Sequence, residues 1–464
     1  MKYYKQIQLG IIILFIITIC LWLNACESFT EVELPQSQLT GTAVFDDVTT
    51  ATAALSNCYA QLRESGMLSG NPDGLSNLMG NYSDELTYYG SPSSPVEDFY
   101  NHTVLPSNAS VSTIWNTGYN QIYAVNAILE GLANTTAISS DDRNRLKGEA
   151  LFLRSFLHFY LLNLYGDIPY IDTTDYKKNS IISRTAENEV YPKIITDLIQ
   201  SKTLLTDTYT TTARIRPNKA AVCALLARVY LYTEKWQQAE EEATAVINNT
   251  AMYHCETDLD KVFLKESPSV IWQLHPGISG LNTHDAHTFI FSSGPPPIAA
   301  VSNNLLNAFE TGDQRKSHWL GSETNGVLTW YYPYKYKQIA NTGTSQEYAI
   351  VFRLEEQYLI RAEARAHQNN LIGAKEDLNV TRHRAGLVDT NADTPANVLM
   401  AVFQERRVEL LTELGQRWFD LKRTGQAGAV LSPLKPGWKS TDKWLPVPAT
   451  ELLLNKNLHQ NAGY

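Results

Sequence analysis

Apolar residues recur at helical spacing along much of the chain. Positions three and four apart are apolar through 51–63, 114–132, 141–164 and 188–206, which places them on one face of a helix in each segment. The third of these helices is predicted to stop at Gly166, because glycine followed shortly by proline ends a helix. The pattern predicts a mainly α protein.

Two later segments, 219–248 and 353–379, have the spacing of a tetratricopeptide helix hairpin. Small residues that let two helices approach closely recur at the same twelve-residue step in both, from Ala227 to Ala239 and from Ala362 to Ala374. Repeated hairpins of this kind stack into a superhelix. The alternative is chance agreement between two unrelated amphipathic hairpins.

The segment between these hairpins, about 251–350, has a different texture. It contains a short apolar run at 269–274 that predicts a strand, and alternation at 330–336 that predicts a second strand with one tyrosine face. We expect a small mixed α+β insertion here, in contrast to an all-helical first half. A Gly-, Pro- and Ser-rich stretch at 65–108 predicts a long irregular loop, and such loops are usually functional.

The N-terminus predicts export. Lys2 and Lys5 precede an apolar run at 9–23, which is too short for a membrane span of about 20 residues and is typical of a secretory signal. Leu23-Asn24-Ala25-Cys26 is similar to a bacterial lipobox. We therefore expect a signal peptide at 1–25, a lipid on Cys26 that attaches the protein to the membrane, and a polar leash after it. The alternative is an ordinary cleaved signal followed by an accidental cysteine.

Composition and charge exclude several classes of protein. The chain is 44% hydrophobic, long enough to bury a large core, so disorder as the main state is excluded. A net charge of −10 with no basic block argues against nucleic-acid binding. Beyond Cys26, only Cys58, Cys223 and Cys255 remain, which favours neither a disulfide framework nor a zinc site. We expect no cofactor.

Groups that could carry chemistry are sparse. Asp84 with Glu85, and Glu97 with Asp98, are adjacent carboxylates, but a glycosidase needs two carboxylates that converge on one cleft, and turn formation explains these pairs as well. The segment 284–287 contains two histidines without further ligands at a recognised metal-binding spacing. The sequence therefore predicts no catalytic residues and no metal site.

Aromatic rings beside polar groups are the strongest candidates for ligand binding, because flat rings stack on the apolar faces of sugars. Two groups fit this description: Tyr82, Asp84, Tyr88 and Tyr89 in the first loop, and Trp319, Trp330, Tyr331 and Tyr332 in the insertion. Core packing is the alternative for each ring. Four further tryptophans lie in helical or strand patterns and are expected in the core: Trp115, Trp236, Trp272 and Trp418.

Several ordered motifs together resemble the SusD/RagB family of outer-membrane nutrient-uptake lipoproteins of Gram-negative bacteria. The early motif is the helix 150–156 followed by Tyr165-Gly166-Asp167-Ile168-Pro169, and the middle one is the Asp-x-Arg turn within 307–315. The late motifs are 352–364, 377–387, 405–410, 415–423, Leu445-Pro446-Val447-Pro448 and the C-terminal 460–464. Ala462 departs from the family, which usually has proline there.

This resemblance implies an architecture of tetratricopeptide-like hairpins with long loops, divided into an N-terminal region at 26–216 and a C-terminal region at 217–464 packed as one body. It implies a lipoprotein of the outer membrane, exposed to the exterior, that delivers an oligosaccharide to a SusC-like, TonB-dependent β-barrel transporter; some members capture peptides instead. The alternative is a surface lipoprotein scaffold of the same fold that binds a peptide or a protein. The charged motif residues are expected to stabilise the fold: Glu363, Arg382, Glu405, Arg407, Arg417 and Asp420.

Overall fold

The computed structural model describes residues 3–4 and 43–464, so the predicted signal peptide, Cys26 and most of the leash lie outside the described residues. The long helices are α2 (Val48–Glu64), α5 (Ala109–Asn134), α6 (Ser140–Tyr165), α8 (Glu187–Leu204), α9 (Lys219–Tyr232), α10 (Trp236–Ile247), α14 (Leu354–His367), α15 (Leu371–Arg384) and α16 (Pro395–Glu409). Among the described helices, none is long and apolar enough to cross a membrane.

Shorter helices connect and cover these long ones. They are η1 (Ala43–Phe45), α3 (Leu75–Tyr82), α4 (Pro95–Asn101), α7 (Tyr176–Asn179), α11 (His284–Phe289), α12 (Asn303–Leu306), α13 (Arg315–His318), α17 (Gln416–Arg423), α18 (Ala427–Leu431), η2 (Ser440–Lys443) and α19 (Ala449–Leu454). The strands form antiparallel pairs: β1 (Leu86–Tyr88) with β3 (Ala299–Val301), β2 (Val270–Leu274) with β6 (Ala349–Arg353), and β4 (Leu320–Thr324) with β5 (Thr329–Pro333).

Successive long helices pack side by side as the hydrophobic pattern predicts. The expected helices at 51–63, 114–132, 141–164 and 188–206 are α2, α5, α6 and α8, and each agrees within a few residues. Local sequence sets their ends: the Asn108 side chain caps the start of α5, and α6 ends at Gly166, which has a positive φ of 72°. The helical fold class is confirmed.

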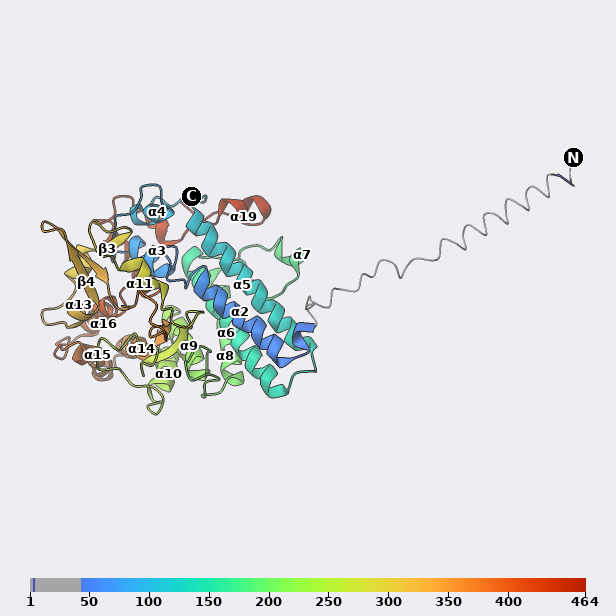
Figure 1. Cartoon of the computed structure of the whole chain (residues 1–464), viewed down its shortest axis with the longest axis horizontal. Coiled ribbons are helices and arrows are strands. Elements are labelled where there is room, and N and C mark those ends of the chain that lie inside the picture. The colour runs from blue at the N-terminus through green and yellow to red at the C-terminus, as the bar shows by residue number, and fades with distance from the viewer. Residues whose placement is uncertain (1–2, 5–42) are drawn as a thin grey trace.

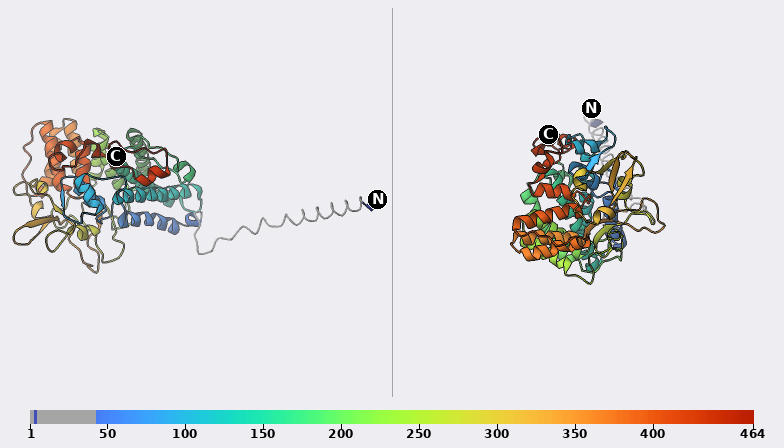
Figure 2. Two further views of the ribbon diagram at one scale, coloured as in Figure 1. Left: turned by 90° about the horizontal axis from the view of Figure 1, so that it is seen from above. Right: turned by 90° about the vertical axis from the view of Figure 1, so that its left-hand side faces the viewer.

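The two predicted hairpins are α9–α10 and α14–α15, and α10 packs directly on α14. The small residues Ala227, Ala239, Ala362 and Ala374 are fully buried between the helices. The prediction of tetratricopeptide-like hairpins is therefore confirmed. Figures 1 and 2 show the helices stacked through the body, with β3 and the β4–β5 pair at the end opposite α7.

The first loop is more ordered than the sequence predicts. The stretch 65–108 contains α3, β1 and α4, and β1 pairs with β3 of the distant insertion, so the first half is not all-helical. The second ring-rich strand, β5, stops at Pro333. Tyr336 therefore leaves the predicted tyrosine face and packs against Phe263 in a separate cluster.

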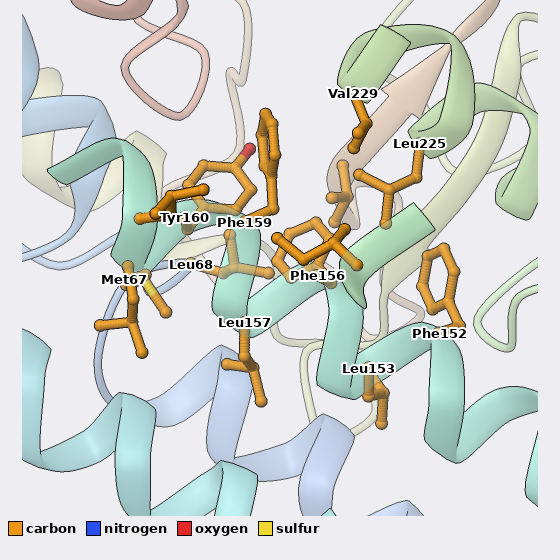
Figure 3. Close-up of a cluster of buried hydrophobic side chains, with 14 of the residues drawn as sticks. Met67, Leu68, Phe152, Leu153, Phe156, Leu157, Phe159, Tyr160, Leu225 and Val229 are labelled. Atoms are coloured by element: carbon orange, nitrogen blue, oxygen red, sulfur yellow. The ribbon is translucent and has the colours of Figure 1, made fainter. Parts of the chain in front are cut away.

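Helix α6 is the centre of the core. Its residues from Leu146 to Tyr165 are almost all buried, because α5, α8 and α9 surround it. Figure 3 shows Phe152, Phe156 and Tyr160 of α6 together with Leu225 and Val229 of α9. The distance between ring centroids is 5.0 Å for Phe152 and Trp272 of β2, so the insertion shares this core.

The core predictions for single residues are largely confirmed. Trp115, Trp272, Trp418 and Cys223 are buried. Trp236 is only partly buried and stacks on the ring of His367 with centroids 3.8 Å apart, so the first turn of α10 is joined to the last turn of α14 at the surface. The cysteines Cys58, Cys223 and Cys255 of the described chain are free thiols.

A buried network of ion pairs joins the insertion to the last helices. Glu409, at the end of α16, pairs with Arg315 of α13, Arg353 of β6 and Arg384 of α15. Burial alone would raise the pKa of Glu409, but the three guanidinium groups together hold it well below its ordinary value. One carboxylate thus joins three segments that are distant in sequence.

The other charged motif residues pair in the same way, which confirms their structural role. Arg407 and Arg417 both bind Asp84, Glu405 binds Arg315, Asp420 binds Arg406, Glu363 binds Arg423, and Arg382 binds Glu310. The partners come from outside the motif's own helix in most of these pairs. A pair between neighbouring turns of one helix also occurs, between Asp420 and Arg423 of α17.

Replacing Glu409 with glutamine should destabilise the protein strongly, because the amide leaves three buried guanidinium groups with one counter-charge fewer. We expect a loss of about 3–5 kcal/mol, the usual cost of removing one partner from a buried ion pair. Urea unfolding followed by circular dichroism measures this loss. The matched control is Asp258→Asn, which removes a surface pair with Lys261 and should change stability little. Equal losses of stability in the two variants would contradict the conclusion that the Glu409 network stabilises the fold.

Candidate ligand-binding site

The first predicted ring group lies at the end of β1. Strand β1 pairs with β3 in the register Leu86 to Val301 and Tyr88 to Ala299, and the backbone N–H groups of Tyr89 and Gly90 both donate to the carbonyl of Ile298, at 2.8 and 3.0 Å. These bonds fix the chain where it leaves the strand. The Tyr89 side chain is 42% exposed, the most open ring of the eight predicted residues.

Tyr88 lies beside Tyr89 and is half-buried. Its hydroxyl donates to the carbonyl of Ser91 at 2.8 Å, and its ring centroid is 6.4 Å from that of Tyr100. A Cβ at Gly90 would lie 2.6 Å from the Tyr88 hydroxyl oxygen, so this ring position requires glycine at 90. Tyr88 and Tyr89 thus form a small aromatic surface whose backbone is held rigidly.

Tyr100 and Lys435 support this surface from below, and the sequence analysis missed both. The Lys435 ammonium nitrogen lies 3.6 Å from the centre of the Tyr100 ring and donates to the carbonyl of Asn81. Burial lowers the pKa of Lys435 to about 7. The sequence could have indicated Tyr100, because it lies in the same ring-rich loop as Tyr88 and Tyr89. It could not have indicated Lys435, which lies far from this loop in the sequence.

The second ring group lies on the β4–β5 hairpin. Trp330 and Tyr332 point to one face and pack with Phe291 and Ala300, whereas Tyr331 points to the other face. Trp330 lies over Gly294 and Tyr332 over Gly321; a Cβ at either glycine would lie within 2.3 Å of the ring. Trp330 and Tyr332 are consequently buried to about nine-tenths, and Tyr331 is half-buried.

The fold brings the two ring groups together on either side of β3. Ala300 pairs with Thr87 of β1 and packs in the cluster with Trp330 and Tyr332, and β3 contacts both β1 and β5. Figure 1 shows β3 between α4 and the β4–β5 hairpin. Segments more than 200 residues apart in the sequence therefore meet at one end of the molecule.

Three predicted ligand contacts are wrong. Tyr82 is 1% exposed and its hydroxyl donates to the carbonyl of Asp442. Trp319 is 0% exposed and its indole N–H donates to the carbonyl of Leu259. Asp84 is 3% exposed and pairs with two arginines. Each polar atom is satisfied inside the protein, so these side chains build the fold beneath the rings.

The sequence contained evidence that Tyr82 is buried. Leu75, Leu78 and Met79 lie seven, four and three residues before it, which is the spacing of one buried helix face, and α3 has that face. Trp319 has a weaker signal, because it closes the short helix that follows the Asp-x-Arg turn.

The adjacent carboxylates do not form a catalytic pair. Burial would raise the pKa of Asp84, but Arg417 and Arg407 lower it below its ordinary value. Burial raises the pKa of Glu85 to about 7, and this side chain accepts a hydrogen bond from the Thr412 N–H. Both carboxyl groups are enclosed and beyond reach of a polymer.

The remaining candidates for chemistry are also structural. Asp98 accepts hydrogen bonds from Thr103 and Asn108 within its own loop, and Asp285, between the two histidines, accepts from the Thr283 hydroxyl. Among residues 3–4 and 43–464, no group of three or more His, Cys, Asp or Glu side chains is placed to hold a metal ion.

The sequence matches two family profiles. Residues 36–231 match the profile described as "starch-binding associating with outer membrane", and residues 298–464 match that of the SusD family. The SusD-like protein P2 of Formosa agariphila is 30% identical over 433 residues, which cover 78% of this chain and 83% of the relative. The SusD-like protein P38 of the same organism is 24% identical across 100% of both chains.

Solved structures share the fold at low identity. A SusD superfamily protein of Bacteroides vulgatus has a TM-score of 0.77 at 21% identity, covering 90% of this chain and 100% of that one. A laminarin-binding SusD-like protein has a TM-score of 0.75 at 24% identity, covering 90% and 99%.

The chain belongs to the SusD/RagB family, as its motifs indicate. This is a family of carbohydrate-binding proteins associated with the outer membrane, not of enzymes. The expectation of a binding protein is confirmed at this level.

Replacing Glu85 with glutamine should change how stability depends on pH. The folded-state pKa of about 7 lies above the ordinary value of 4.5, so the native protein binds this proton more tightly than the unfolded chain does. The stabilisation is complete below pH 4.5 and is lost as pH rises through 7, an effect of roughly 3 kcal/mol for this one group.

Glu85→Gln keeps the acceptor for the Thr412 N–H and cannot ionise. Urea midpoints measured from pH 5 to 8 should therefore fall less steeply for the variant than for the natural protein. Parallel pH profiles would show that Glu85 does not hold its proton in the fold.

Proposed function

We propose that this protein is a lipid-anchored lipoprotein of the cell surface that captures a glycan and delivers it to a TonB-dependent β-barrel transporter. The observation that carries the proposal is the convergence of the two ring groups across β3. Tyr88 and Tyr89 lie on one side of this strand and the rings of β5 on the other. In a family of carbohydrate-binding proteins, such a surface is the natural ligand site.

The arrangement suits a sugar polymer. Exposed tyrosine rings stack on the apolar faces of pyranose units, and nearby hydroxyl groups bond the equatorial oxygens. Tyr89 supplies the open ring, and Ser91 and Ser93 supply exposed hydroxyls beside it. One solved protein that shares this fold is described as laminarin-binding. We therefore propose glucans such as laminarin or starch fragments as the first ligands to examine.

The ligand site includes Tyr88, Tyr89 and Tyr331, with Trp330 and Tyr332 contributing the edges that reach the surface. Tyr331 is half-buried on the opposite face of β5, so it contacts ligand only if the glycan wraps around the hairpin. The helical hairpins would contact the barrel. Cys26 would carry the lipid.

Tyr89→Ala should weaken glycan binding, because it removes the most exposed ring of the site. One stacking ring contributes about 1 kcal/mol beyond its buried area, so the affinity should fall about fivefold to tenfold. Isothermal titration against laminarin and malto-oligosaccharides measures this change, with a mixed peptide library titrated in parallel.

The matched control is Tyr123→Ala, which removes a tyrosine that is 51% exposed on α5, outside the proposed site. Its affinity should equal that of the natural protein. Equal losses in both variants, or no loss in Tyr89→Ala, would contradict the site. Binding of peptides and of no glycan would replace the glycan proposal with the peptide-capturing alternative.

The transporter partner has a separate test. A tagged chain should co-purify from detergent-solubilised outer membranes with a TonB-dependent β-barrel identified by mass spectrometry. Tyr89→Ala should leave this association unchanged. Absence of any such barrel from the natural protein's complex would contradict the delivery step while leaving glycan capture intact.

A further inference from the structure

Helix α19 is unusual for what it leaves exposed. It contains three consecutive leucines, yet within the described body it has no buried residue. Leu453 is 69% exposed and Leu454 is 79% exposed. Large apolar side chains that gather on the surface of a folded protein usually mark a contact with a partner or a membrane.

The surrounding contacts hold α19 in place. The Ala449 N–H donates to the carbonyl of Pro106 at 2.9 Å, before α5. At the other end, the Asn455 and Asn457 side chains donate to the carbonyls of Ile182 and Ile181, at 2.8 and 2.5 Å. The exposed leucines are therefore part of a fixed surface.

Neighbouring segments extend this apolar surface. Leu105 lies beside the start of α19 and is 60% exposed; Ile181 lies beside its end and is 64% exposed; Tyr176 of α7 is 71% exposed. We name these three residues together with Leu453 and Leu454 the α7–α19 face. Figure 1 shows α7 and α19 at the margin of the body.

The charges around the α7–α19 face suit a lipid headgroup layer. Lys177, Lys178 and Lys456 are exposed, with long apolar stems that let the ammonium groups reach headgroup phosphates. The acidic residues Asp172, Asp175 and Glu451 offset these lysines, and Asp175 also caps α7. The face is thus close to neutral on a chain with a net charge of −10.

The α7–α19 face lies near the point where the N-terminal segment joins the body. The ring of Phe45 in η1 lies against Gly131 near the end of α5. The preceding residue, Glu130, accepts hydrogen bonds from the Thr173 hydroxyl and the Thr174 N–H, directly before α7. Residues 27–42 reach at most about 55 Å even when extended, so a lipid on Cys26 keeps this end of the body close to the bilayer.

We propose that the α7–α19 face docks on the outer-membrane lipid surface, with Leu453, Leu454 and Tyr176 inserted among the headgroups. Exposed apolar side chains flanked by lysines are the pattern of an interfacial contact, and tyrosine favours this depth. The β4–β5 hairpin lies at the other end of the body from α7. Docking through α7 would therefore hold this hairpin away from the bilayer.

The test uses the mature chain without its lipid, residues 27–464, which keeps every described contact of the body. Large unilamellar vesicles of phosphatidylethanolamine with phosphatidylglycerol, and of phosphatidylcholine alone, are sedimented with the protein. The natural chain should sediment with both. The double variant L453S/L454S should lower the vesicle partition coefficient about tenfold, because it removes two large apolar side chains from the inserted surface.

The matched control is V327S/L328S, which removes two exposed apolar residues from the tip of the β4–β5 hairpin and should leave sedimentation unchanged. K177Q/K178Q should reduce binding to the phosphatidylglycerol vesicles more than to phosphatidylcholine. The four substituted positions, 453, 454, 177 and 178, are exposed. Melting temperatures equal to that of the natural chain would verify that the variants are folded.

Three results would overturn the proposal: no sedimentation of the natural chain, equal loss in the hairpin control, or unchanged binding of L453S/L454S. Loss of transporter co-purification in L453S/L454S, without any vesicle binding by the natural chain, would assign the face to a protein partner instead. None of these results depends on whether the protein binds a glycan.

Discussion

The fold depends on buried ion pairs that join its last helices to the insertion. Glu409 holds Arg315, Arg353 and Arg384, so α13, β6 and α15 converge on the end of α16. Charges at this depth are stable only when they are paired and hydrogen-bonded, because burying an unpaired charge costs several kcal/mol. The requirement fixes the insertion on the helical body in one arrangement.

The candidate site depends on a second such contact. Asp84, directly before β1, pairs with Arg407 and Arg417, and its backbone carbonyl accepts the Ser302 hydroxyl directly after β3. The strand that carries Tyr88 is therefore attached both to the helical body and to the insertion. Rings on such a supported strand lose little conformational freedom on binding, which favours capture of a weakly binding ligand.

The two proposed surfaces use apolar side chains differently. At the ring-bearing end, most of each large ring is buried and a limited face or edge is open, which favours a polar ligand with flat apolar faces. At the α7–α19 face, Leu453 and Leu454 are largely exposed, which favours insertion into a soft apolar layer.

The sequence by itself determined the helices, the paired hairpins and the family, because helical periodicity and ordered motifs are local properties of the chain. It also pointed to two ring-bearing regions, which the fold brings together across β3. Only the tertiary structure decided which rings reach the surface. Tyr82 and Trp319 are buried and donate hydrogen bonds to the carbonyls of Asp442 and Leu259, whereas Tyr89 is partly exposed. Lys435 beneath Tyr100 and the partners of Glu409 were likewise beyond local patterns, because exposure and charge pairing depend on segments that meet only when the chain folds.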